Sequence, residues 1–240
     1  MKKINKTTKD FMFKEFSIYG GLSGMPVSTD GVLLGAWFNC YKETPQVLDI
    51  GTGTGLLSLM CAQRFTRSKI TAVEIDHEAA KAATINFGTS NWNERITLLQ
   101  QDILDYVPDE RFDTIVCNPP YFVSGEQSHI QQRATARHTG CLEHQALLIK
   151  CLEILEVDGN ACFILPLTEG EQFIEIARNL GWHLTALCRV KPTNRKATNR
   201  LLIELSPMPK PLSATEITIR DSEGYTKPFT ELTKSFYLKM

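Results

Sequence analysis

Residues 46–55 read QVLDIGTGTG, a short apolar run that stops at an acidic residue and then continues into three alternating glycines. The next ten residues, LLSLMCAQRF, have the apolar content of a buried helix. This pattern predicts a strand, a tight loop and a helix. In open α/β sheets, such a junction binds ligands at the carboxyl end of the strand.

The spacing of the glycines narrows the kind of ligand. A dinucleotide loop, G-x-G-x-x-G, would need glycine at position 56, where this chain has Leu56, and no Lys-Ser or Lys-Thr follows as in a Walker loop. Asp49 before the loop would repel a pyrophosphate. A carboxylate there suits a ligand with a cationic amine, such as S-adenosylmethionine.

Further strands and helices alternate along the chain. After the first unit, strands are expected at 69–76, 96–104, 112–120, 161–166, 183–192 and 197–207, and helices at 77–87, 146–160 and 168–182. The second of these helices should close at Asp158-Gly159, and the third at Gly181. The alternation predicts a mostly parallel sheet, and the two late strands in succession predict an antiparallel partner at one edge.

Two more acids follow strands of the expected sheet. Glu74 and Asp102 stand at the ends of the second and third strands, as Asp49 does in the first. One crevice would then hold acceptors for an amine, a ribose diol and an adenine amino group. The alternative for each acid is a helix cap, a common role for carboxylates at strand ends.

Composition sets the remaining bounds. In 240 residues, 26 Lys and Arg oppose 27 Asp and Glu, so a nucleic-acid partner would have to meet local basic patches. The seven cysteines form no zinc-like spacing, so no metal site is expected, and their odd number suggests a reducing compartment. No apolar signal region and no run of 18 apolar residues occur, which predicts a cytoplasmic protein without membrane contact.

Residues 115–122, IVCNPPYF, raise a separate question. Two prolines cannot continue a strand, so the apolar run should end at Asn118. A rigid turn with Tyr121 in the core is one explanation, and a chemical role for the amide and the ring is the other. Cys117 lies in the apolar run and is expected to pack rather than react.

The order of the glycine loop, VEID, QQDIL and NPPY resembles the class I S-adenosylmethionine methyltransferases, and NPPY resembles the tetrapeptide of the amino-methyltransferases. FKEFSI, MPVSTDGVLLGAW, RATARHTG and SFYLKM are similar to segments of the bacterial enzymes that methylate N6 of adenine 37 in tRNA1(Val). This similarity covers almost the whole chain. It implies a Rossmann-like α/β fold with a seven-stranded sheet in the order 3-2-1-4-5-7-6, strand 7 antiparallel and helices on both faces.

The resemblance also implies roles for the tetrapeptide. The Asn118 side chain and the Pro119 carbonyl would accept hydrogen bonds from an exocyclic amine, and Tyr121 would stack on the base. The predicted catalytic residues are Asn118, Pro119, Pro120 and Tyr121. The predicted cofactor-binding residues are Asp30, Asp49, Gly51, Gly53, Gly55, Glu74, Ile75, Asp102, Ile103 and Asn118. For Asp30, a helix N-cap at Thr29 or Asp30 is an equal alternative.

Two segments without acids, residues 127–142 and 189–203, would grip phosphates near the crevice. The predicted nucleic-acid-binding residues are Arg133, Arg137, His138, Lys191, Arg195 and Lys196. The expected partner is tRNA, with no obligate protein partner. Residues 1–30 are expected to form an N-terminal extension that is a candidate for RNA contact, and residues 31–240 a single methyltransferase domain.

Other functions remain open on the sequence. The same acceptors would serve guanine N2 in ribosomal RNA or a glutamine in a protein. A non-catalytic RNA-binding protein is a further alternative, although Asp49, Asn118 and Tyr121 are all present. A nicotinamide oxidoreductase is disfavoured by Leu56 in the loop.

Overall fold

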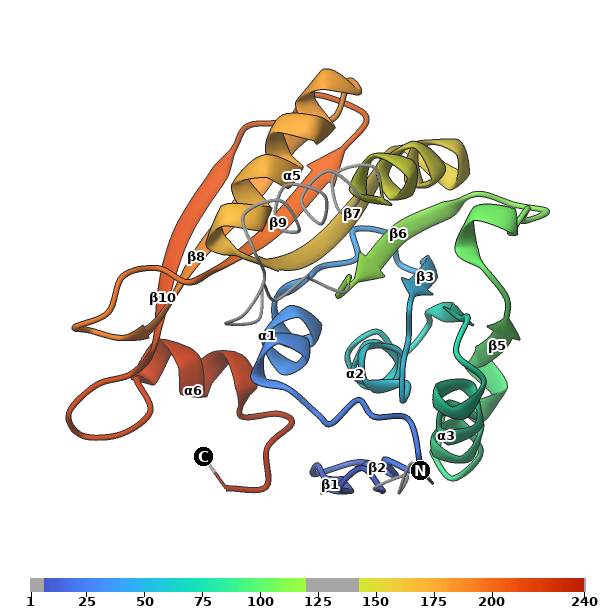
Figure 1. Ribbon diagram of the computed structural model, residues 1–240, viewed down its shortest axis with the longest axis horizontal. Helices are drawn as coiled ribbons and strands as arrows, with labels where there is room; N and C mark the ends of the chain where they lie inside the picture. The colour runs from blue at the N-terminus through green and yellow to red at the C-terminus, as the bar shows by residue number, and fades with distance from the viewer. Residues whose placement is uncertain (1–6, 120–142, 240) are drawn as a thin grey trace, which may run out of the picture.

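A computed structural model describes residues 7–119 and 143–239. Its centre is an eight-stranded sheet (Figure 1). In chain order the strands are β3 (Gln46–Ile50), β4 (Lys69–Glu74), β5 (Ile96–Gln100), β6 (Phe112–Cys117), β7 (Leu155–Pro166), β8 (His183–Thr193), β9 (Arg200–Ser206) and β10 (Ser213–Arg220). The helices are α1 (Thr29–Trp37), α2 (Leu56–Arg64), α3 (His77–Gly88), one over residues 143–154, α5 (Leu167–Asn179) and α6 (Lys227–Thr233).

The strand order agrees with the expected topology. Across the sheet it is β10-β8-β9-β7-β6-β3-β4-β5, and β9 is antiparallel to both of its neighbours while all other pairs are parallel. If β3 to β9 are counted as strands 1 to 7, this order is 3-2-1-4-5-7-6. The class-level expectation of a Rossmann-like α/β fold is therefore confirmed.

The sheet differs from the expected one at one edge. The antiparallel strand β9 lies between β7 and β8, as the order 3-2-1-4-5-7-6 requires, because the chain reverses after β8 and places its next strand there. The edge is formed by an eighth strand, β10, which runs parallel to β8. Only Ile217 of β10 is buried, so this strand has little of the apolar signal by which strands are recognised.

The helix over residues 143–154 ends earlier than the expected closure at Asp158-Gly159. Leu155 already pairs with Phe112, and the register then shifts so that Asn160 pairs with Thr114. The extra residues form a bulge in β7, where polar residues are tolerated because the strand locally leaves the ladder. Asp158-Gly159 therefore lies in a bulge of β7 and does not end the helix.

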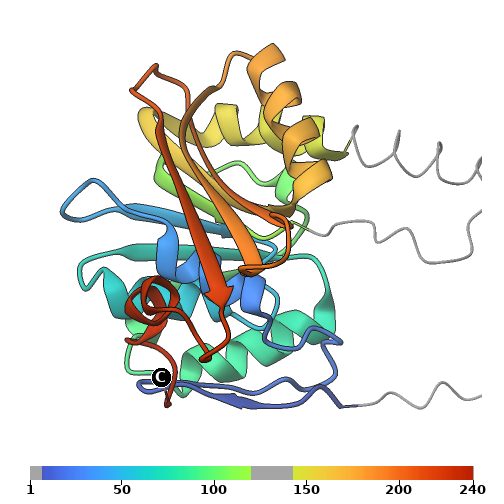
Figure 2. The same cartoon turned by 90° about the vertical axis from the view of Figure 1, so that its left-hand side faces the viewer.

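Helices cover both faces of the sheet (Figure 2). One apolar cluster joins one face to α1, α2, α3 and α6, and the other joins the opposite face to α5 and the helix over residues 143–154. Both faces of the sheet and both helix layers therefore bury their apolar sides, as a doubly wound sheet requires. No helix within the described residues is both long and apolar enough to cross a membrane.

The N-terminal residues pack onto the same core. A small hairpin of β1 (Phe11–Met12) and β2 (Ser17–Ile18) places Phe13, Phe16 and Ile18 in the cluster that contains α1 and α2. Phe13 also bridges to Tyr237 near the other end of the chain. The proposed division between residues 30 and 31 falls inside α1 and stays a prediction.

Replacing Phe173 by Ala should lower the free energy of unfolding by about 3–5 kcal/mol, because this fully buried ring of α5 leaves a cavity. Its centroid lies 4.8 Å from that of Phe163 in β7. Urea unfolding followed by circular dichroism measures the change. Gln172→Ala, on the exposed side of the same helix, should change the free energy by less than about 0.5 kcal/mol. Equal effects of the two variants would contradict this packing.

Candidate active site

Three neighbouring parallel strands, in the middle of the sheet, end side by side at what is the carboxyl end of the sheet. Ile50 at the end of β3 pairs with Val73 of β4 on one side and with Cys117 of β6 on the other. The residues that follow these strands are therefore neighbours in space. The parallel register brings together the glycine loop, Glu74 and Asn118, as the sequence predicted.

The glycine loop joins β3 to α2 through a left-handed backbone. Gly51, Gly53 and Gly55 have φ angles of 66°, 58° and 88°. A Cβ atom at Gly55 would lie 2.4 Å from Cε1 of Phe87, so both the backbone conformation and the packing of α3 require glycine there. The amides of Gly51 and Thr52 donate to the Val73 carbonyl at 2.9 and 3.1 Å, which ties the loop to β4.

Asp49 is fully buried beneath this loop. Its Oδ2 accepts hydrogen bonds from Thr52 Oγ1 at 2.5 Å, Ser58 Oγ at 2.7 Å and the Ser58 amide at 3.0 Å. Its Oδ1 is buried and has no partner among the described residues. Burial raises the pKa of Asp49 from its ordinary value of 3.8 to about 6, against the opposing effect of the Thr52 and Ser58 hydrogen bonds.

Glu74 links the loop to the start of α3. Its Oε2 accepts from the Gly53 amide and its Oε1 from the Asp76 amide, both at 2.8 Å. Asp76 in turn caps α3 by accepting from the Ala79 amide at 2.8 Å. The capping role that was the alternative for Glu74 thus belongs to Asp76, while Glu74 lies beside the glycine loop at the carboxyl end of β4.

At the end of β5 the alternative role of the acid, a helix cap, is observed. Asp102 caps the short 3-10 helix η2 (Ile103–Asp105), and its Oδ1 accepts from the Leu104 amide at 2.9 Å. Its side chain remains partly exposed. Ile103 packs partly against the core, whereas Ile75 is 66% exposed. The exposed apolar side chain of Ile75 directly follows the buried Glu74 and is a surface on which an aromatic ring could pack.

The strand β6 ends at Cys117, one residue before the expected end. Asn118 follows, and its side-chain Oδ1 is buried without a hydrogen-bond partner among the described residues. Cys117 is buried, and burial raises the pKa of its thiol well above the ordinary value, so packing is its role. Pro119 is buried, while the predicted residues Pro120 and Tyr121 lie outside the described residues.

Asp30 is not the cap of α1, and neither is Thr29. The cap is Ser28, whose Oγ accepts from the Gly31 amide at 3.1 Å. Asp30 instead forms an ion pair with Arg200 at the start of β9, with Oδ2 2.7 Å from Nε. No local pattern indicates this pair, because its two members are 170 residues apart.

The basic residues of segment 189–203 lie beside the same carboxyl end of the sheet. Arg195 and Lys196 are exposed in the turn between β8 and β9, and β9 begins opposite Pro166, at the carboxyl end of β7. Lys191 forms an ion pair with Glu216 of β10 at 2.8 Å. The predicted residues Arg133, Arg137 and His138 lie outside the described residues.

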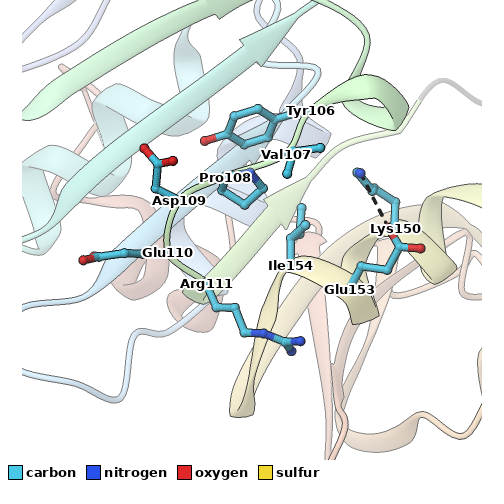
Figure 3. A pocket seen from close by; sticks show the side chains of 9 residues that line it. All are labelled: Tyr106, Val107, Pro108, Asp109, Glu110, Arg111, Lys150, Glu153 and Ile154. Atoms are coloured by element: carbon cyan, nitrogen blue, oxygen red, sulfur yellow. Dashed lines mark ion pairs between the residues drawn. The ribbon is translucent and has the colours of Figure 1, made fainter.

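A cleft of about 310 Å³ lies at the opposite end of the sheet, where the strand β6 begins (Figure 3). It is formed by residues 106–111, which precede β6, and by Lys150, Glu153 and Ile154 at the end of a helix. Its charges are mixed, and Lys150 and Glu153 form an ion pair at 3.5 Å. The length of β6 separates this cleft from Asn118, so it belongs to a different part of the molecule.

Four residues of the crevice were missed in the sequence. They are Thr52, Ser58, Asn86 and Arg200, and each contacts the loop or a predicted site residue. Thr52 could have been found, since it lies between two of the glycines. Ser58 is only nine residues from Asp49 but lies in a helix that was recognised by its apolar residues, while Asn86 and Arg200 make contacts across 32 and 170 residues that local patterns do not report.

The chain was compared with known proteins. The methyltransferase small domain family model matches residues 33–149. The chain is 56% identical over 240 residues, 100% of both chains, to a tRNA1(Val) (adenine(37)-N6)-methyltransferase from Vibrio campbellii. It is 51% identical over 233 residues, 97% of this chain and 99% of the relative, to a protein of the same name from Aliivibrio fischeri.

Solved structures agree on the fold. An Agrobacterium tumefaciens protein described as a predicted O-methyltransferase superposes with a TM-score of 0.67 at 17% identity, covering 86% of this chain and 96% of its own. The TYW2 protein of P. horikoshii, in complex with MeSAdo, superposes with a TM-score of 0.57 at 17% identity, covering 80% and 68%.

The raised pKa of Asp49 predicts a pH dependence of stability. Between about pH 4 and pH 6 the folded protein holds a proton on Asp49 that the unfolded chain has released, so the free energy of unfolding falls as the pH rises through this range. Asp49→Asn lacks this contribution. Its stability relative to wild type should therefore improve by about 2 kcal/mol between pH 4 and pH 7. Urea unfolding of both proteins across this range measures the difference, and a constant difference would contradict the assignment.

Proposed function

The chain belongs to the family of tRNA1(Val) (adenine(37)-N6)-methyltransferases, and from this premise we propose that it transfers a methyl group from S-adenosylmethionine to N6 of adenine 37 in that tRNA. The observation that carries the proposal is the buried Oδ1 of Asn118 beside the glycine loop, for which residues 7–119 and 143–239 provide no hydrogen-bond donor. A buried acceptor without a donor is costly unless a ligand supplies the donor.

The crevice fits the proposed cofactor. Asp49 Oδ1, the second buried oxygen without a donor among the described residues, is an acceptor for a cationic amine. Glu74 lies at the end of the second strand, where ribose hydroxyls are bound in related folds. A Cβ atom at Gly51 would meet nothing within 4 Å, so the loop leaves open space at this point. We assign the holding of the cofactor to these residues together with Asp30, Gly53, Gly55, Ile75, Asp102 and Ile103.

When bound, S-adenosylmethionine supplies a methyl group on a positively charged sulfur as the electrophile. An exocyclic amine of adenine is a poor nucleophile because its lone pair is delocalised into the ring. Asn118 Oδ1 and the Pro119 carbonyl would accept its two N–H groups and favour a pyramidal nitrogen whose lone pair is free to attack. No side-chain base is needed, since the proton becomes acidic once the nitrogen is alkylated.

The base must leave its stack to reach this edge of the sheet. We assign stacking on the base to Tyr121, and contacts with the RNA backbone to Lys191, Arg195 and Lys196 together with Arg133, Arg137 and His138. The turn between β8 and β9 supports the assignment, since its exposed Arg195 and Lys196 lie at the carboxyl end of the sheet, where Asn118 also lies.

Asn118→Ala should reduce methyl transfer by about 10²- to 10³-fold while the cofactor still binds, because an acceptor that acts on the reacting amine is lost. The assay is transfer of labelled methyl from S-adenosylmethionine to tRNA1(Val) transcribed without modifications, followed by nucleoside analysis. Cofactor binding is measured separately by calorimetry. Asn91→Ala, at an exposed position beyond α3, is the matched control and should retain full activity.

The outcomes separate the alternatives. N6-methyladenosine at position 37, lost in the Asn118 variant, supports both the chemistry and the substrate. Label in ribosomal RNA or in a protein, but not in tRNA, would replace the substrate by guanine N2 or by glutamine. Full activity of the Asn118 variant would contradict the proposed chemistry.

The double substitution Arg195→Gln, Lys196→Gln should weaken tRNA binding by about tenfold and make the dependence of log Kd on log salt less steep by about 2. Cofactor affinity should not change. Filter binding at several salt concentrations measures both quantities. Lys69 is an exposed lysine at the start of β4, at the opposite end of the strands. Lys69→Gln should leave the tRNA affinity and its salt dependence unchanged. Equal loss in this control would show a general charge effect instead.

A further inference from the structure

The N-terminal segment, defined as residues 7–28, passes alongside the glycine loop on its way to α1. Figure 1 shows it running from beside α3 to the start of α1. The Thr8 amide donates to the Gly21 carbonyl at 2.7 Å, and the Gly20 amide donates to Asp10 Oδ1 at 2.9 Å. These bonds give the segment a defined course rather than that of a loose tail.

Asn86 of α3 fastens this segment to the loop. Its buried side chain accepts from the Tyr19 amide at 2.7 Å and donates to the Tyr19 carbonyl at 3.0 Å. The same Nδ2 donates to the Thr54 carbonyl at 2.8 Å. One amide therefore holds both the N-terminal segment and the glycine loop, and a buried network of this kind fixes their relative positions.

Met25 lies against the loop as a result. A Cβ atom at Gly53 would be 3.4 Å from Met25 Cε and 3.5 Å from its Sδ, so the thioether packs over this glycine. The Gly53 amide donates to Glu74 at 2.8 Å, which places Met25 next to the proposed ribose-binding acid. Yet Met25 is 41% exposed, so much of its apolar surface is not covered by the protein.

We propose that Met25 is part of the cofactor site and packs against the nucleoside half of S-adenosylmethionine. This inference rests on the proposed function. A thioether is flexible and polarisable, which suits contact with a sugar and a heteroaromatic ring. Its position beside Gly53 and Glu74 assigns it to the nucleoside rather than to the amino-acid half, which meets Asp49. At position 25, the N-terminal segment therefore contacts the cofactor rather than the RNA.

The test is calorimetry without tRNA, using two probes: S-adenosylhomocysteine and 5′-methylthioadenosine, which lacks the amino acid. Met25→Ala should weaken both by the same factor, about tenfold, because only the nucleoside contact is lost. Met25→Leu, similar in volume, should stay within about threefold of wild type. Met12→Ala is the matched control, a methionine of the same segment that is 65% exposed on the hairpin, and it should change neither affinity.

Hydrogen exchange distinguishes a contact from a structural effect. The Tyr19 amide, bonded to Asn86, should stay as protected in Met25→Ala as in wild type. Loss of this protection, unchanged affinities, or weakening of S-adenosylhomocysteine alone would each overturn the proposal for Met25. A wild-type protein that binds neither probe would instead overturn the proposed cofactor, and with it the proposed function.

Discussion

The crevice depends on the hydrogen bonds made by the buried carboxylate of Asp49. A charge removed from water is costly, and here three donors from the loop and the first turn of α2 compensate it on one oxygen. These bonds determine where the loop turns and where the helix begins. The other oxygen has no donor within the part of the chain that the structure describes. The same side chain that shapes the loop therefore provides an acceptor for a ligand.

The acids at the strand ends do not divide neatly into structural and binding residues. Glu74 holds Gly53 and Asp76 by single backbone bonds, and a carboxylate oxygen can accept more than one donor. Asp102 uses one oxygen for a cap and remains partly exposed. In the sequence, a cap and a ligand acceptor are alternatives because both roles use the same carboxylate atoms. The structure allows them together.

The features found in the sequence are those with a local cause. The strand–loop–helix junction, the end of β6 before two prolines and the glycine at the end of α5 all follow from neighbouring residues. The contacts missed have no such cause: Arg200 meets Asp30 across 170 residues, and Asn86 meets Tyr19 across 67. The strand β10 was missed because its position at the edge buries a single apolar residue. Local patterns therefore predicted the elements, and only the fold revealed what joins them.

The residue at position 118 is an amide where a carboxylate would accept hydrogen bonds more strongly. The charges nearby explain this choice. Burial is the main reason that the pKa of Cys117 is raised, and the negative charges of Asp49 and Glu74 raise it further, so their field reaches the end of β6. A third carboxylate in this field would be driven towards its protonated form, which donates a proton where an acceptor is needed. Asn118 provides an acceptor whose strength does not depend on its neighbours' charge.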